Sequence, residues 1–272
     1  RTARCAFCRE GDRTDMDWSR AKTVLIWAFL LLNVLLGYQL WMDELNLTTF
    51  AENAGLREEM NRQLALKGVR LEATVPEGTP VLSEMTVGLR SFGGTGEPAP
   101  LSTPFPRYWL ADPLFVRDSV AGDVPSIGDY EPDPYAEMKE DLVYVMNQIY
   151  DGYPLFEMRL ELYGGGDLVE RYRYRFAERR EPPDEDAPKG QEVLSAYVVL
   201  GNLAERYLPR GAVVADVRLG YHGPIFESET QVLAPYWRVV LETGETYYVH
   251  AISVAVEGPA PGPGGNGPET EQ

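Results

Sequence analysis

The sequence predicts an α+β protein with one N-terminal transmembrane helix and an extracytoplasmic domain of two similar helix-plus-antiparallel-sheet units. Three observations support this fold class. An uncharged apolar run fills residues 23–42, two segments at 156–162 and 171–176 alternate with period two, and a helix followed by strands occurs twice beyond residue 68. With 272 residues and 44% hydrophobic content, the chain can also bury a substantial core.

Charge is distributed unevenly along the chain. The formal net charge is −17 and the isoelectric point about 4.6, which argues against a nucleic-acid partner because phosphate contacts need a basic surface. Residues 1–42 hold six basic and four acidic residues, which leaves 19 basic and 38 acidic residues in 43–272. The sign of the charge therefore changes across the apolar run.

The apolar run at 23–42 is long enough to cross a membrane. It has twenty residues, and a helix needs about 20 to span the hydrocarbon core. Arg20 and Lys22 precede it while Asp43 and Glu44 follow it, so the positive-inside rule places the N-terminus in the cytoplasm and the C-terminal domain outside the cell membrane. A cleaved signal peptide is the alternative, but the run is longer than such a segment and has no small-residue cleavage site.

Residues 1–22 form the expected cytoplasmic flank. Residues 1–15 have no methionine and no periodicity, and we expect translation to start at Met16. Cys5 and Cys8 form a single CxxC pair, which is half of a zinc site without a second pair or a nearby histidine. The remainder of the chain contains no cysteine, so no disulfide is expected there.

A helical stalk is expected over residues 43–68, ended by Gly68. The first extracytoplasmic unit covers residues 69–180. Its predicted elements are strands at 69–75, 81–92 and 108–115, a helix at 134–151, and a hairpin of strands 156–162 and 171–176 joined at 164–167.

The hairpin carries a row of arginines on its polar face. Arg171, Arg173 and Arg175 alternate with aromatic residues, and the first strand carries Glu157 and Glu161. We expect the arginines to pair with the glutamates across the hairpin, and a docking stripe is the alternative.

The second unit covers residues 189–256, after an acidic, proline-containing break at 180–188. A helix is predicted at 192–208, followed by strands at 212–221, 236–241 and 246–256 with a turn at 242–245. Residues 257–272 consist mostly of Gly, Pro and Glu and are expected to be a disordered tail.

Catalytic motifs are absent from the sequence. His222 and His250 show no metal-ligand spacing, and there is no nucleophile elbow and no phosphate-binding loop. We expect His222 to be structural, although Glu227 and Glu229 lie near it in sequence, and His250 to pack in the last strand. The chain is therefore predicted not to be an enzyme and to bind no metal or cofactor.

The apolar run instead suggests a binding surface. Asn33 falls near the middle of the bilayer, where an amide tends to find a partner across a helix interface, and Gly37 allows close backbone approach. The predicted partner-binding face consists of Ile26, Leu30, Asn33, Gly37 and Leu40. A single tolerated asparagine in an isolated anchor is the alternative.

Three segments resemble the YycI (WalI) family. They are Met16-Asp-Trp-Ser-Arg with the following apolar run, Leu219-Gly-Tyr-His-Gly with Ala234-Pro-Tyr-Trp-Arg-Val-Val, and Thr246-Tyr-Tyr-Val-His-Ala. The resemblance runs from Met16 to about Val256. It implies a non-catalytic regulator of the two-component system that controls cell-wall metabolism in low-GC Gram-positive bacteria. The implied partners are the sensor histidine kinase WalK (YycG), the related YycH protein and the lipid bilayer.

Two other functional classes stay open. The segment Pro235-Tyr-Trp-Arg-Val-Val faintly resembles PepSY-type domains, which would make the outer domain a ligand sensor or a modulator of proteases. A cell-wall hydrolase would need a metal held by His222 and nearby carboxylates.

Overall fold

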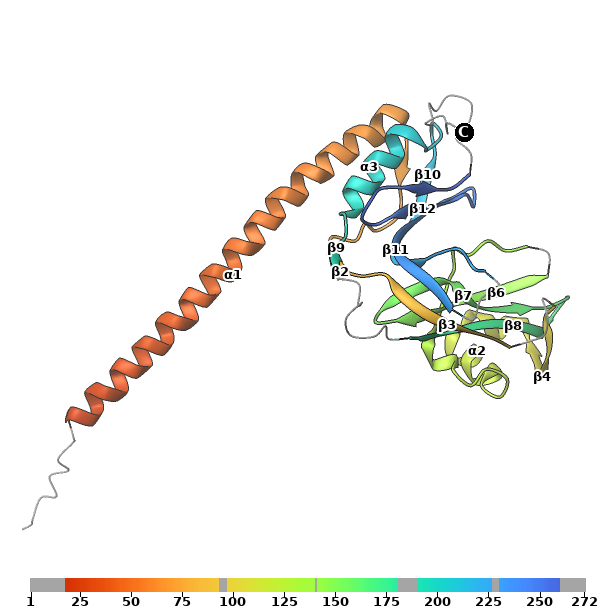
Figure 1. Ribbon diagram of the computed structural model, residues 1–272, viewed down its shortest axis with the longest axis horizontal. Coiled ribbons are helices and arrows are strands. Elements are labelled where there is room, and N and C mark those ends of the chain that lie inside the picture. The colour runs from red at the N-terminus through yellow and green to blue at the C-terminus, as the bar shows by residue number, and fades with distance from the viewer. Residues whose placement is uncertain (1–17, 93–96, 140, 181–189, 227–229, 260–272) are drawn as a thin grey trace, which may run out of the picture. The chain divides into compact units, whose positions relative to one another are not determined.

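The computed structural model describes residues 18–92, 97–139, 141–180, 190–226 and 230–259 (Figure 1). The chain divides into two compact units, residues 1–54 and residues 55–272. Residues 1–17 of the predicted flank at 1–22 and most of the predicted tail lie outside the described residues. Glu257, the first residue of that tail, belongs to a strand.

The helices and strands confirm the α+β class. In chain order they are α1 Trp18–Lys67, β1 Arg70–Leu71, β2 Val81–Leu82, β3 Met85–Phe92, β4 Ala99–Pro106, the 3-10 helix η1 Arg107–Ala111, α2 Pro113–Val120, the 3-10 helix η2 Ile127–Asp129, β5 Tyr130–Pro132, β6 Leu142–Tyr150, β7 Tyr153–Tyr163, β8 Leu168–Arg179, β9 Gln191–Glu192, α3 Ala196–Arg206, β10 Val213–His222, β11 Thr230–Leu241, β12 Thr246–His250 and β13 Val256–Glu257.

The predicted membrane span and stalk both fall within α1, which ends at Lys67. Gly68 follows in the left-handed region with φ of 67°, the conformation that commonly ends a helix. Among the residues that the structure describes, none of the helices is long and apolar enough to cross a bilayer.

Eleven strands of the described residues form one mixed sheet, ordered β1-β10-β11-β3-β8-β7-β6-β5, with β4, β12 and β13 attached at its sides (Figure 1). β11 joins the two parts of the sheet, because residues 230–233 pair with β3 and residues 234–241 pair with β10. β10 also pairs with β7 through Tyr221 and Leu155, so the five strands β10, β11, β3, β8 and β7 form a closed circuit of pairings.

Each part of the sheet is covered by one helix. α3 packs its buried face on β10, β11 and β12, and α2 packs on β4, β6, β7 and β8. Both helices begin at side-chain caps: the Ser195 hydroxyl accepts the Tyr197 N–H, and the Asp112 carboxylate accepts the Leu114 N–H. Helix followed by antiparallel strands occurs twice, but the first helix is α2 and not the predicted helix at 134–151, and the strands of both parts belong to one sheet.

The helix predicted at 134–151 is wrong, because residues 142–150 form β6. This strand lies between β5 and β7 and is buried along its middle. A strand covered on both faces has a continuous apolar run, here Val143-Tyr-Val-Met146, and its spacing also fits a helix. The spacing within this segment does not reveal the neighbouring strands β5 and β7, whose pairing with it makes it a strand.

The strand predicted at 108–115 is also wrong, because this segment forms η1 and the start of α2. Asp112 as the cap and Pro113 at the first helical position begin a helix. The hairpin, the strands at 81–92, the helix at 192–208, and the strands at 212–221 and 236–241 with their turn are confirmed. The predicted strands at 69–75 and 246–256 are shortened to β1 and to β12 with β13.

Candidate functional site

The predicted partner-binding residues lie on one side of α1. Ile26, Leu30, Asn33 and Gly37 follow each other at intervals of four and three residues, which places them along one helix face. Ile26 is 63% exposed and Leu30 is 50% exposed. Apart from the backbone of its own helix turns and its two chain neighbours, no described atom lies within 4 Å of the position that a Cβ on Gly37 would take. The side chain of Leu40 is outside the described ones.

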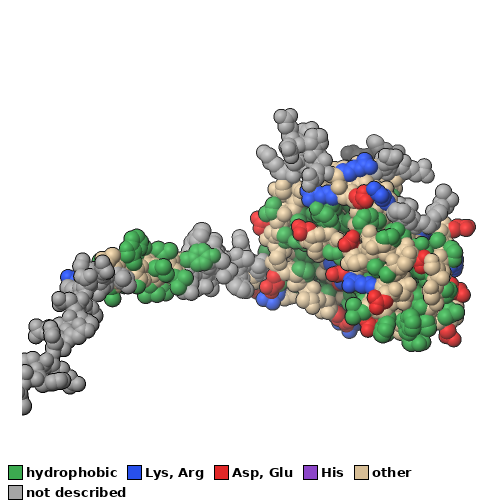
Figure 2. All heavy atoms as spheres, turned by 90° about the horizontal axis from the view of Figure 1, so that it is seen from below, with side chains coloured by type: hydrophobic (Ala, Val, Ile, Leu, Met, Phe, Trp, Pro, Cys, Tyr) green, Lys and Arg blue, Asp and Glu red, His purple; other side chains and the backbone are tan. Residues whose placement is uncertain are grey.

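This helix segment exposes large apolar side chains at successive positions from Leu25 to Leu36, and therefore on every side of the helix. Figure 2 shows them on the face of α1 that is in view. A shallow hollow on it is lined by Leu25, Ile26, Phe29, Leu30, Asn33 and Val34. Because apolar groups occur on every side, the features that distinguish one face are the amide of Asn33 and the gap beside Gly37.

A second group of polar residues surrounds His222 at the end of β10. Its Nδ1 contacts Glu157 Oε1 of β7, and its Nε2 lies 3.4 Å from Glu257 Oε2 of β13. The imidazole stacks on Tyr248 with ring centroids 3.9 Å apart. Tyr236 donates its hydroxyl hydrogen to Glu257 Oε1 at 2.7 Å. His222 thus connects three strands, in agreement with the predicted structural role.

Two opposing effects act on the pKa of His222. Burial disfavours the charged imidazolium, but the hydrogen bond and the negative charge of Glu157, with a smaller contribution from Glu257, outweigh burial and raise the pKa above 6.5. The cation is therefore the favoured form over a wider pH range than in a free histidine. Glu227 and Glu229, suggested by sequence as neighbours, lie outside the described residues.

No metal site accompanies this histidine: the described part of the chain contains no group of three or more His, Cys, Asp or Glu side chains arranged to hold a metal ion. His250 has a local role, because its Nδ1 accepts the backbone N–H groups of Ile252 and Ser253 at 3.2 and 3.3 Å. It caps the turn after β12 instead of only packing in the strand.

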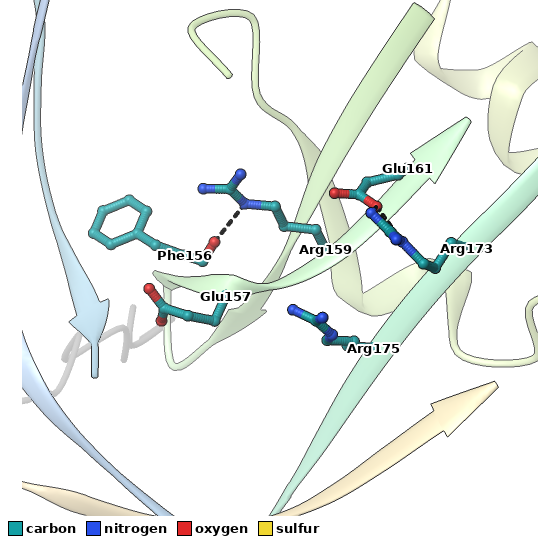
Figure 3. Close-up of a pocket in the computed structure, with 6 residues that line it drawn as sticks. All are labelled: Phe156, Glu157, Arg159, Glu161, Arg173 and Arg175. Carbon is teal, nitrogen blue, oxygen red and sulfur yellow. Dashed lines mark hydrogen bonds and ion pairs between the residues drawn. The ribbon is translucent and has the colours of Figure 1, made fainter. Parts of the chain in front are cut away.

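Next to this histidine, the β7–β8 hairpin forms a polar pocket of about 230 Å³ (Figure 3). Its lining residues are Phe156, Glu157, Arg159, Glu161, Arg173 and Arg175. Arg173 Nη2 lies 2.6 Å from Glu161 Oε2, and these two residues face each other in the strand register. The predicted arginine–glutamate pairing is confirmed at this position.

The other two arginines of the predicted row behave differently. Arg171 contacts Asp141 instead of a glutamate of β7, and Arg175 has no ion pair among the described residues. Continuing the register by one step places Arg175 opposite Arg159, because β7 carries an arginine between its two glutamates. The sequence already contained this signal, which the prediction of a simple pairing overlooked.

A buried ion pair lies under the pocket wall. Arg238 of β11 contacts Asp133, and both side chains are almost fully inaccessible. Asp133 also accepts a hydrogen bond from Asn147 Nδ2 at 2.7 Å, and the Arg238 guanidinium lies 4.7 Å from the centroid of the Phe156 ring. This group was not predicted from the sequence. An arginine inside the apolar run Tyr236-Trp-Arg-Val-Val240 was the available signal.

Comparisons with known proteins point to one family. The model of the family described as "YycI protein" matches residues 116–252, half of the 272-residue chain. No curated protein gives a significant match. Solved structures that resemble the chain include an uncharacterized protein from Eubacterium rectale, with a TM-score of 0.27 and 11% identity. That match covers 52% of this chain and 50% of the other.

Proposed function

Because the chain belongs to the YycI protein family, we propose that it is a non-enzymatic, membrane-anchored regulator of the sensor histidine kinase WalK that acts together with YycH. The matched residues 116–252 run from α2 to the turn after β12, which is most of the globular unit. The bilayer anchor of this proposal is residues 23–42, with the globular unit outside the cell.

The observation that carries the mode of action is the exposed apolar segment of α1. Its large side chains are exposed among the residues that the structure describes, and one face combines Asn33 with the open space beside Gly37. In a membrane, helices associate through small residues that allow close approach and through amide hydrogen bonds. This face therefore suits packing against the transmembrane helices of the kinase and of YycH.

Regulation requires more than association. A partner shifts the equilibrium between two kinase states only if it binds one of them more tightly. In this proposal the contact through Ile26, Leu30, Asn33, Gly37 and Leu40 differs between the two kinase states, and the globular unit sets the position of the helix.

The test is affinity purification of the tagged full chain from detergent-solubilised native membranes. Three versions are compared: wild type, a chain with residues 23–42 replaced by an unrelated anchor, and the double variant Asn33→Leu with Gly37→Leu. Leu31 and Leu35 lie on the opposite side of the helix, so Leu31→Ala with Leu35→Ala is the matched control.

Recovery of the kinase and YycH with wild type and with the control, but not with the other two, is the expected result. Recovery with the replaced anchor assigns the contact to the globular unit and contradicts the helix mechanism. If wild type recovers neither protein, the regulatory function itself is contradicted.

Ligand sensing by the outer domain is the second candidate function. One observation favours it: a pocket on the β7–β8 hairpin whose lining includes three arginines, in a chain of net charge −17. Binding by this pocket is compatible with kinase regulation, since a sensor needs both a ligand site and an output.

A further inference from the structure

The pocket on the β7–β8 hairpin contains more positive charge than its own residues neutralise. Of its two carboxylates, Glu161 is paired with Arg173, and Glu157 is engaged by His222. The remaining charged groups are the guanidiniums of Arg159 and Arg175, and neither forms an ion pair among the described residues. The lining residues therefore carry three guanidiniums and two carboxylates, an excess of one positive charge, and two of the guanidiniums have no carboxylate partner within the described part of the chain.

These cations line the same pocket from adjacent strands. Arg159 donates its Nε–H to the Phe156 carbonyl at 2.6 Å, which fixes the side chain and leaves the two terminal nitrogens for another acceptor. Figure 3 shows Arg175 reaching from β8 toward β7, while the guanidinium of Arg159 turns toward Phe156. Like charges on facing positions of adjacent strands repel each other, so this arrangement costs free energy until an anion joins them.

The surroundings make the pair unusual for this chain. Residues 43–272 carry a net charge of −19, and free carboxylates are abundant on the surface. A pocket that keeps two arginines without a carboxylate partner in such a chain has a local charge opposite to that of the whole unit. This local positive charge attracts anions that come close to the pocket, and dissolved salt screens the attraction at longer distances.

We propose that this pocket binds a phosphate dianion, either free inorganic phosphate or the terminal phosphate of a monoester, bridged by Arg159 and Arg175. A guanidinium donates two parallel hydrogen bonds to an oxyanion, and phosphate offers enough oxygens for both arginines. A phosphate monoester carries a charge near −2 at neutral pH, so it is attracted to the two unpaired guanidiniums more strongly than a carboxylate of charge −1. This site does not depend on contacts between α1 and a kinase.

Binding is measured by isothermal titration calorimetry on the full chain in detergent at neutral pH and constant ionic strength. The probes are inorganic phosphate, methyl phosphate and, as a monoanion, acetate. We expect saturable binding of at least one phosphate probe, with acetate at least about tenfold weaker. Preference for methyl phosphate over inorganic phosphate identifies the monoester source, and the reverse identifies the free ion.

The variant Arg175→Gln removes one of the two cations. The Arg175 side chain is exposed and forms no ion pair among the described residues, so the substitution breaks no ion pair there. It should weaken phosphate binding at least about tenfold, since charged hydrogen bonds of this kind are the strong ones. Arg90→Gln is the matched control. Residue 91 pairs with Arg175, so the side chain of Arg90 lies on the opposite face of the sheet, where it pairs with Glu178.

Three results overturn the proposal. They are no saturable phosphate binding by wild type, equal binding by Arg175→Gln and wild type, and equal weakening by Arg90→Gln and Arg175→Gln. Equal affinity for acetate and phosphate overturns the assignment of a dianion. Thermal unfolding of each variant, measured in the absence of phosphate, must match wild type for the titration to count as support.

Discussion

Arg238 Nη2 lies 2.8 Å from Asp133 Oδ1 in the interior of the globular unit, and the second nitrogen of the same guanidinium contacts the second carboxylate oxygen. Asp133 follows β5 and Arg238 lies in β11, so the pair connects the part of the sheet under α2 with the part under α3. Asp216 of β10 contacts the same arginine at 3.2 Å. One buried cation therefore links three segments that are distant in sequence.

Removing Asp133 should destabilise the chain strongly. Asp133→Ala leaves the charge of Arg238 buried with only Asp216 nearby, and breaking a buried pair in this way costs about 3–5 kcal/mol. Urea unfolding of the full chain in detergent measures the free energy of unfolding. The matched control is Glu178→Ala, which removes the partner of Arg90 from an exposed pair and should cost about 1 kcal/mol or less.

The double variant Asp133→Leu with Arg238→Met separates the charge from the packing. Apolar residues of similar volume often replace a buried ion pair at little cost, so the double variant should be more stable than Asp133→Ala. A double variant as unstable as the single one would show that the hydrogen bonds of Asp133, including that from Asn147, matter more than the buried charge.

Stability should depend on pH through His222. Its folded-state pKa is raised, so the contacts with Glu157 and Glu257 contribute fully at pH values below the unfolded pKa of 6.5. This contribution is lost as the pH rises through the folded-state pKa. The difference in free energy of unfolding between wild type and His222→Gln should therefore shrink as the pH is raised from below 6.5 to above the folded-state pKa.

Because Glu257 is 57% exposed, most of this difference should come from Glu157, whose side chain is 14% exposed. Glu257→Gln is the matched variant. It should reproduce only a small part of the pH-dependent difference in unfolding free energy that is seen between wild type and His222→Gln. A difference between wild type and His222→Gln that is constant across this pH range would show that stacking on Tyr248 is what His222 contributes.

Gly220 is required by the close approach of β10 and β7. A Cβ at this position would lie 2.5 Å from the Pro154 carbonyl oxygen and 2.7 Å from the Phe156 ring. Gly220→Ala should therefore cost about 1–3 kcal/mol of unfolding free energy, as overpacked sites do. Gly165→Ala is the control, since nothing lies within 4 Å of that Cβ position, and it should change stability little. Equal effects of the two substitutions would contradict this packing argument.

The sequence was most informative where buried and exposed positions alternate regularly along an element. Strands β7 and β8 were predicted from their alternation, and α3 from its single apolar face. It misled where both faces are buried, as in β6, because a continuous apolar run has no distinctive period.

Prediction of the candidate sites from sequence had a similar limit. The face of α1 was named from spacing alone and stays a prediction. An arginine between the two glutamates of β7 and an arginine inside the apolar run of β11 are visible in the sequence, but their surroundings are not. The partner of Arg238, for example, is Asp133, which lies 105 positions away in the chain. Local patterns do not contain such pairings.

The last turns of α1 join this helix to the globular unit, and the final prediction concerns this junction. Met60 is 2% exposed and Leu64 is 4% exposed in the core around α3, where the Met60 Cα lies 3.8 Å from the Cβ position of Gly201. Lys67 Nζ donates a hydrogen bond to the Leu208 carbonyl at 3.1 Å. Met60→Ala should cost about 2–5 kcal/mol of unfolding free energy, as large-to-small core substitutions do, whereas Leu66→Ala at a 71% exposed position of the same helix should cost little.

Under the proposed function, Met60→Ala should also weaken control of the kinase while leaving its association intact. The face around Asn33 is unchanged by this substitution, so the kinase should still be recovered in the affinity purification. Kinase autophosphorylation in native membranes should then shift toward the level seen without this protein, because a loosened junction no longer transmits the position of the globular unit to the helix. Loss of the kinase from the purified complex would instead place the binding contact in the globular unit.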